Sequence, residues 1–549
     1  MSKKLFKKIA MVALSSTLLV SGVACGGGGG STGGGADTEQ TLQIYVFDQG
    51  YGTQWCTDIA EEFKKQDWVK SAYPNLVIDI DTNDVAGFAK QQLDIGSKKN
   101  SYDLLFGAAL SDFAGGTEIL NLTESVYNKN LPGENVTYGD KLKDSVKTSF
   151  VYHDRTVADP IDEYYMVPFQ GGQTGILYNA DKLASFNIEA PRTTDELYQA
   201  MVKIKEKGEY PIIQSDDAPY WTKHMMQVWW AQYEGVEGYN NFYEGEVIVD
   251  GFEQKSKGIF EQKGRLESLK VFEKLLKSTN DKSSTTENFI HDSSFGSNTF
   301  MVQQSAFLTG TGTFHVNGDW FDDEMKEMKA SLIKGGQTVH TIKMLRTPIV
   351  SSIINNCPDS SIANDAELSA LIKAIDANKT ELKGEGYEVT QADFDKILEA
   401  RFIVDGTNAG VGGVIPSYAK GKDIAVDFVR FMGTDIGLGA YAKATLGATL
   451  DFEYNLMEAD QSVYDSVSPL NRDRIAYFNS PIKEIQILRT PSSFPLNKYG
   501  NVTPFVKTSY FEVFSTIGNT ETPEDYFEDT KANWTDAIWD NALKNAGLK

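Results

Sequence analysis

Residues 41–107 alternate between strand and helix patterns, and this order restricts the possible folds more than any other feature of the chain. Residues 41–47 alternate apolar side chains as a strand does, and residues 76–80 and 102–107 indicate two further strands. Apolar residues at helical spacing occupy both intervening segments. Strands joined by helical crossovers run parallel to each other. We therefore predict an α/β fold, in which ligands bind at the carboxyl ends of the strands.

Length and charge limit the function. The chain has 549 residues, 41% of them hydrophobic, which is enough for packed interiors but too long for a single core. The formal net charge is −24 and becomes −28 without residues 1–24, which contain four lysines and no acids. Such an acidic surface repels nucleic acid and anionic lipid headgroups. We expect two or more domains and no nucleic-acid partner.

The first 24 residues have the pattern of a secretory leader. Four lysines precede an apolar run over residues 9–20, which is too short to span a bilayer comfortably. The run closes in residues 21–25, which resemble a bacterial lipobox with Gly22 where leucine is usual. We therefore expect cleavage before Cys25 and lipidation of its thiol. The alternative is an ordinary signal peptide cut after Ala24.

The residues after Cys25 predict a flexible tether. Residues 26–35 are glycine apart from one serine and one threonine, so they cannot pack and would tether a globular body to the membrane. No second apolar run approaches the length of a membrane-spanning helix. The expected location is the outer face of the cell membrane of a bacterium, with a Gram-positive source expected.

Cysteines and histidines are few. Besides Cys25 the chain has only Cys56 and Cys357. A disulfide between them is conceivable in an oxidising compartment, but two buried free thiols are the expected state. The five histidines form no zinc-binding pattern, so we expect no metal site and no cofactor.

The rest of the chain predicts further elements but no internal repeat. Residues 298–304 are expected to be helical, 305–308 a strand and 309–320 a turn region. Residues 358–400 are charged and helix-prone, and look like an elaboration. Further helices are expected over 191–207 (capped by Thr193 or Thr194), 264–276, 419–433 and 523–545.

Several of these stretches resemble one protein family. They are residues 44–63, Val167-Pro168 with 174–179, 300–307 with Gly318-Asp319-Trp320, and 415–417 leading into 423–429. In this order, after a lipobox, they resemble the extracellular solute-binding proteins of ABC importers, in the large sugar-binding family. The third stretch departs from the family pattern, with Gln303-Gln304 in place of a glycine and Phe307 where methionine is common.

The resemblance implies a two-lobed, periplasmic-binding-protein-like fold with a hinge and a ligand cleft between the lobes. By analogy, lobe one is residues 41–167 with 403–465, and lobe two is 168–402 with 466–549. Residues 1–24 would be the leader and 25–40 the lipidated tether. The implied function is capture of a solute, expected to be a carbohydrate, by hinge closure, and its delivery to the permease subunits of an ABC importer. A monomer is expected.

A sugar site needs aromatic faces and hydrogen-bonding amides or carboxylates. The candidates lie at predicted strand ends, at glycine-rich junctions, in an aromatic stretch and at the family signature. They are Asp48, Tyr51 and Asp112; Gln170, Gln173 and Asn408; Trp221, Trp229 and Trp230; and Asp319 and Trp320. Adjacent side chains point in different directions, so at most one of Trp229 and Trp230 would face a ligand. For the tryptophans, packing in a core is the alternative to ligand contact.

Two other functional classes remain as alternatives. A surface glycoside hydrolase would use two of the many carboxylates, and an adhesin or sensor module would bind carbohydrate without transport. The sequence contains no nucleophile elbow, phosphate-binding loop or metal motif. We therefore predict a binding protein rather than an enzyme, with no catalytic residues.

Overall fold

The computed structural model describes residues 40–154, 161–168, 171–215, 221–249, 251–276, 289–295, 299–384, 386–406, 411–478, 483–488, 495–504, 517 and 520–549. The predicted lipidation site Cys25 and two candidate site residues, Gln170 and Asn408, lie outside these residues.

The first sheet contains the strands predicted at the start of the chain. Its order is β2 (Leu76–Asn83), β1 (Gln40–Phe47), β3 (Leu104–Ala108), β15 (Val411–Val414) and β6 (Val167–Pro168). β1 runs parallel to both β2 and β3, which confirms the predicted crossover order. β15 returns antiparallel to β3 and to β6.

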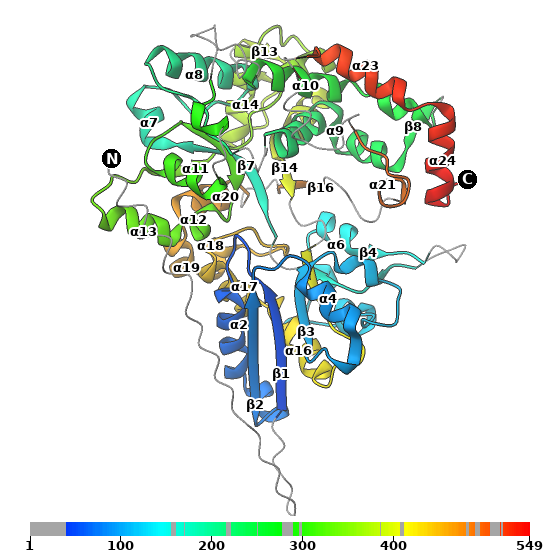
Figure 1. The fold of residues 1–549 in the computed structure, drawn as a ribbon. Helices are drawn as coiled ribbons and strands as arrows, with labels where there is room; N and C mark the ends of the chain where they lie inside the picture. The colour runs from blue at the N-terminus through cyan, green and yellow to red at the C-terminus, as the bar shows by residue number, and fades with distance from the viewer. Residues whose placement is uncertain are drawn as a thin grey trace, which may run out of the picture. The chain divides into compact units, whose positions relative to one another are not determined.

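Helices cover both faces of the first sheet, because alternate residues of its strands point to opposite sides. Leu42, Ile44 and Val46 pack on one side with α2 (Gln54–Lys65) and α16 (Lys422–Met432). Tyr45 and Leu105 pack on the other side with α4 (Phe88–Ile95). Figure 1 shows α2 and α4 on opposite sides of β1 and β3.

The second sheet has its own core. Its order is β10 (Phe314–Gly318), β7 (Gln173–Asn179), β14 (Ile403–Gly406) and β16 (Ile485–Leu488), with β11 (Ile342–Met344) also pairing with β7. Ile176 of β7 packs in the larger hydrophobic cluster, to which α8 (Thr194–Glu206), α9 (Met226–Glu244) and α10 (Lys263–Leu276) contribute. Leu177 packs in a separate cluster with Phe307 and Phe321. Adjacent residues of β7 therefore serve opposite faces of the sheet.

The chain crosses between the two sheets at glycine-rich junctions. β6 lies in the first sheet and β7 in the second, while β14 lies in the second and β15 in the first. The expected boundary at residue 403 would place β14 in lobe one. β14 instead pairs with β7 and β16 of the second sheet. It begins directly after α15 (Gln391–Phe402), and the glycine-rich junction that returns the chain to the first sheet comes only after it. The remaining lobe boundaries stay a prediction.

Three local predictions were wrong. Residues 305–308 belong to α11 (Phe300–Leu308), whose buried positions 303, 304, 307 and 308 have helical spacing. The expected turn region contains β10, fully buried and antiparallel to β7. The last helix is two helices, α23 (Pro523–Asn533) and α24 (Asp536–Ala546), because the Thr535 side chain caps a new N-terminus by accepting from the Ile538 amide.

Other predictions held. The Thr193 hydroxyl caps α8 by accepting from the Glu196 amide. The elaboration forms α14 (Asp365–Asp376), a short hairpin β12–β13 (Lys383–Gly384, Tyr387–Glu388) and α15. Cys56 and Cys357 are both buried and free. Burial raises the pKa of Cys357 to about 11, with smaller effects from nearby charges.

The remaining elements are short or peripheral. They are α3 (Asp67–Ala72), α5 (Tyr138–Lys141), α6 (Asp144–Phe150), β4 (Val151–Tyr152), β5 (Glu163–Tyr164), α7 (Ala180–Ser185), β8 (Glu246–Val249), β9 (Phe252–Lys255), α12 (Phe321–Glu324), α13 (Lys326–Lys334), α17 (Asp435–Ala444), α18 (Leu456–Ala459), α19 (Gln461–Ser466), α20 (Pro469–Phe478), α21 (Pro495–Lys498) and the single-turn helices η1 (Gly96–Lys98), η2 (Leu110–Phe113), η3 (Thr123–Tyr127), η4 (Trp221–Met225), η5 (Lys257–Glu261), η7 (Asp292–Phe295) and η8 (Ser351–Asn356). Within the described ranges, no helix combines the length and the hydropathy that crossing a membrane requires.

Trp230 is a structural anchor of α9. It is fully buried, its ring packs against Tyr239 and Phe242 at centroid distances of 4.6 and 5.0 Å, and its indole N–H donates to Gln262 at 2.9 Å. Trp230→Ala should lower the free energy of unfolding by about 3–5 kcal/mol, because a large buried side chain leaves a cavity. Chemical denaturation measures this loss. The control Ile538→Ala, at a half-exposed position, should change stability by less than about 0.5 kcal/mol, and an equal effect of both variants would contradict the core assignment.

Candidate functional site

The carboxylate of Asp319 connects segments that lie far apart in the sequence. Asp319 follows β10 and is fully buried. Its Oδ1 accepts from the Tyr51 hydroxyl at 3.0 Å and from the Gln173 amide at 3.4 Å, and its Oδ2 accepts from the Thr449 amide at 2.5 Å. The Asn471 side chain donates to its main-chain oxygen at 2.9 Å. We call these residues the Asp319 cluster.

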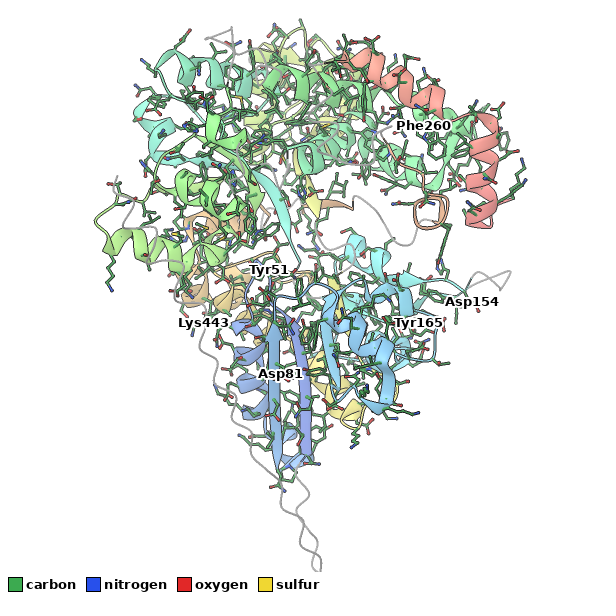
Figure 2. All side chains as sticks on the ribbon, viewed as in Figure 1. Tyr51, Asp81, Asp154, Tyr165, Phe260 and Lys443 are labelled. Carbon is green, nitrogen blue, oxygen red and sulfur yellow. The ribbon has the colours of Figure 1, made fainter. Side chains whose placement is uncertain are left out.

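Tyr51 brings the first sheet into this cluster. It follows the end of β1, in the loop before α2, and is labelled in Figure 2. Burial raises the pKa of Tyr51 well above its ordinary value, and the nearby charge of Asp319 raises it further. The phenol therefore stays protonated and serves as a donor to the carboxylate.

Trp320 forms an aromatic surface beside the cluster. Its indole meets the Tyr51 ring edge-on, with centroids 5.6 Å apart and an interplanar angle of 74°. The indole also packs on the backbone of Gly50 and Gly318: a Cβ at Gly50 would lie 2.6 Å from the indole Cδ1. Only glycine leaves room for the ring at this position. The Trp320 side chain remains half-buried, with part of its surface open.

Two carboxylates, Asp323 and Asp48, lie near the loop that carries Tyr51. Asp323 lies close to the same loop, since a Cβ at Gly52 would be 3.3 Å from its Oδ2. Burial raises the pKa of Asp323 to about 6, an effect that Lys326 opposes and Asp48 increases. Partial burial and the neighbouring charge of Asp84 raise the pKa of Asp48. Together the aromatic ring and the carboxylates provide the two kinds of contact that a sugar requires.

The structure brings together some of the predicted site residues. Tyr51, Gln173, Asp319 and Trp320 share the Asp319 cluster or pack against it. The charge of Asp48 raises the pKa of Asp323, so these two carboxylates lie near each other. Their roles toward a ligand stay a prediction.

The other predicted residues lie elsewhere. Asp112 is exposed in η2, and no contact joins it to the cluster. Trp229 and Trp230 are fully buried in the core around α9, and Trp221 is almost fully buried there too. Their burial favours the packing alternative, because a helix that lies against both a sheet and neighbouring helices buries adjacent side chains.

Sequence reasoning missed Thr449, Asn471 and Asp323. The first two contribute a backbone amide and a side-chain amide from positions 130 and 152 residues away from Asp319. No local pattern signals such contacts. Asp323 could have been found, because it lies three residues after Trp320 of the Gly318-Asp319-Trp320 signature.

The comparison with known families agrees with this architecture. The family model described as bacterial extracellular solute-binding protein matches residues 57–263. This stretch of the chain is therefore similar to the bacterial extracellular solute-binding proteins. The resemblance inferred from its motifs is thereby confirmed. No curated protein matches the chain.

Solved structures show what the fold of this chain is similar to. One, from work on xylan utilization by the thermophilic bacterium Caldanaerobius polysaccharolyticus, is 15% identical, with a TM-score of 0.55 over 90% of this chain and 100% of that one. The GacH receptor of Streptomyces glaucescens, solved unliganded and with acarbose, is 14% identical, with a TM-score of 0.51 over 91% and 99%.

A third is an ABC substrate-binding protein from Listeria monocytogenes in complex with cycloalternan, 13% identical, with a TM-score of 0.51 over 93% and 100%. Similarity at these identities concerns the fold, and it confirms the predicted two-lobed α/β class.

Asp323 should make the stability of this protein depend on pH. Its folded pKa of about 6 exceeds the unfolded value, so its ionisation costs stability as pH rises through that range. Asp323→Asn should therefore stabilise the protein by about 1 kcal/mol at pH 8, a figure reduced for partial solvent exposure, and by nothing at pH 4. Denaturation at pH 4, 6 and 8 tests this. Asp94→Asn, at an exposed position on α4, is the control, and a gain for Asp323→Asn that is equal at all three pH values would argue against the assignment.

Proposed function

We propose that this protein is a solute-binding protein, which captures a carbohydrate between its two lobes and delivers it to an ABC importer. The supporting observation is the half-buried indole of Trp320, packed on Gly50 beside Tyr51, with the carboxylate of Asp323 close to the same loop and Asp48 near enough to raise the pKa of Asp323. An indole covers the C–H face of a sugar ring, and carboxylates accept hydrogen bonds from its hydroxyls. Two of the similar solved structures hold acarbose and cycloalternan, which are consistent with this class of ligand.

Capture proceeds by hinge closure in this proposal. β6 and β15 belong to the first sheet and β7 and β14 to the second, so the chain passes between the sheets more than once, and closure would turn the two parts about these connections. The ligand binds the closed arrangement more tightly and so shifts the population toward it. Tyr51 and Asp319 link the first-sheet loop to the end of β10, so their hydrogen bond favours closure.

The anchor and partner complete the proposal. Lipidation at Cys25, followed by the glycine tether, would hold the protein at the outer face of the bacterial membrane, where the permease subunits of an importer can receive the solute. The protein would act as a monomer and bind its ligand without chemical turnover. The acidic body would gain its membrane affinity from the lipid alone.

Trp320→Ala tests the ligand site. The substitution removes the stacking surface and should weaken binding of the carbohydrate by about 2–3 kcal/mol, or roughly 30- to 150-fold. The carbohydrate is first identified by thermal shift over a sugar panel, since a ligand of the native state raises the melting temperature. Calorimetric titration then measures the affinity of the variant.

Trp229→Ala is the matched control for that experiment. Trp229 is fully buried, so its truncation should cost about 3–5 kcal/mol of stability and leave affinity nearly unchanged. If Trp320→Ala instead kept its affinity and lost as much stability as Trp229→Ala, Trp320 would be a core residue and the proposed site would be wrong.

Cys25→Ser tests the anchor. The variant should fold normally but lose lipid attachment, because serine offers no thiol to the diacylglyceryl donor. After detergent-free lysis and fractionation, wild type should remain with the membranes and the variant should appear in the soluble fraction or the medium. A variant that stays with the membranes as fully as wild type would refute the assignment of Cys25 as the lipidated residue.

A further inference from the structure

The hairpin formed by β8 and β9 has an open edge. Within the described residues these two strands pair only with each other, and every side chain of β9 is exposed. An isolated two-stranded hairpin is marginally stable in water, and an open edge strand offers unpaired backbone groups to another strand. The outer edge of β9 is therefore a candidate surface for pairing with another chain. We call it the β9 edge.

The rest of the fold holds the base of this hairpin in place. Val247 packs partly against the larger hydrophobic cluster, and the Ser256 hydroxyl accepts from the Gly258 amide at 3.0 Å. Lys257 forms an ion pair with Asp536 of α24 at 2.6 Å, and Figure 1 shows β8 close to that helix. The β9 edge is thus presented already ordered, so another strand can pair with it at a small cost in conformational entropy.

The backbone groups of Glu253 and Lys255 point toward the open side of β9. The Ser256 amide donates to the Gly245 carbonyl at 2.9 Å, which identifies these two residues as a hydrogen-bonded pair of the hairpin. Hydrogen-bonded and non-hydrogen-bonded pairs alternate along antiparallel strands, so Gln254 also directs its backbone groups to β8. The amides and carbonyls of Glu253 and Lys255 then point the other way.

This spacing makes the β9 edge complementary to itself. When a second copy approaches antiparallel, Glu253 lies opposite Lys255 of that copy, Lys255 lies opposite its Glu253, and Gln254 lies on the two-fold axis. Each of the two outer pairs joins residues whose backbone groups point outward, so each exchanges both of its hydrogen bonds. The hairpins then form one sheet in the order β8, β9, β9, β8, which is more stable than an isolated hairpin.

The charges of the hairpin agree with this pairing. Lys255 lies opposite Glu246 and forms an ion pair with it. Glu253 lies opposite Ile248, so the hairpin itself places no cation across from this carboxylate. In the joined sheet each Lys255 would lie between Glu246 of its own copy and Glu253 of the other. Opposite charges at facing positions stabilise antiparallel strands, so the second copy supplies the cation that Glu253 lacks across its own hairpin.

The size of the edge limits the strength of the contact. β9 has four residues, so its pairing buries much less than the roughly 1,200–2,000 Å² of a stable interface. Such a contact is populated when the local concentration reaches about 1 mM, which tethering can supply. Ligand binding stays within each copy, so the monomer remains the binding unit.

We propose that the β9 edge is a self-association surface, through which two copies of this chain pair antiparallel at high local concentration, with Glu253 of each copy opposite Lys255 of the other. The inference depends neither on what the Trp320 site binds nor on lipidation of Cys25, because concentration alone can drive the pairing.

Disulfide cross-linking tests the register. Gln254 would face Gln254 of the second copy in a non-hydrogen-bonded pair, where Cα atoms lie about 4.5 Å apart and a disulfide can form. Every variant carries Cys25→Ser, which removes the thiol of the tether, while Cys56 and Cys357 are buried. The full chain with Gln254→Cys is concentrated to about 1 mM, oxidised mildly and separated on a non-reducing gel. Its dimer fraction should exceed that of the control Asp94→Cys, at an exposed position of α4, by about tenfold, because pairing holds the two thiols together.

Charge reversal distinguishes the proposed pairing from chance collision. Lys255→Glu, added to Gln254→Cys, places like charges opposite each other on both sides of the axis and should lower the dimer fraction by about fivefold. Adding Glu253→Lys as well restores opposite charges in the same register and should recover part of the dimer. Three results would overturn the inference: equal dimer fractions for Gln254→Cys and Asp94→Cys, no effect of Lys255→Glu, or no recovery in the charge-swapped chain. Melting curves of each variant verify that the protein is folded.

Discussion

The buried carboxylate of Asp319 is the interaction on which the arrangement of the candidate site depends. A buried charge is costly unless hydrogen bonds compensate it, and here the donors come from three segments: the loop after β1, the start of β7 and the chain after α17. One acidic side chain therefore connects the first-sheet loop, β7 and the chain after α17 at the end of β10.

The aromatic surface follows from that constraint. Tyr51 donates to Asp319, which fixes its ring, and the ring edge supports the indole of Trp320. Gly50 completes the support, because any larger residue would collide with the indole. A ring held in this way has little freedom to lose when a ligand stacks on it, so binding costs less conformational entropy. The Asp319 cluster can thus contribute to affinity without touching the ligand.

The sequence predicted those features that depend on short-range patterns of residues. The strand and helix order of residues 41–107 was correct because apolar periodicity is a short-range pattern. The Asp319 cluster was only half predicted: Tyr51, Gln173 and Asp319 were candidates, but Thr449 and Asn471 act through amides 130 and 152 residues away. For the tryptophans of α9, the sequence suggested ligand contacts that the structure does not favour. Their aromatic density suggested sugar contacts, yet composition alone cannot distinguish a ligand surface from a core.

Residues 447–452 make hydrogen bonds to two polar residues that lie far away in the sequence, Asp319 and Lys143. On one side the Thr449 amide completes the coordination of Asp319, and on the other Lys143 donates its amide to the Asp451 carbonyl while its side chain pairs with Glu484. Asp319 and the Lys143–Glu484 ion pair are thus both connected to one short stretch of backbone. A movement of that stretch would lengthen its hydrogen bonds to Asp319 and to Lys143 at the same time. Both changes would cost free energy, because a buried charge is destabilised when it loses a partner. The stretch is therefore expected to move between discrete arrangements rather than gradually, which is the property that hinge closure requires.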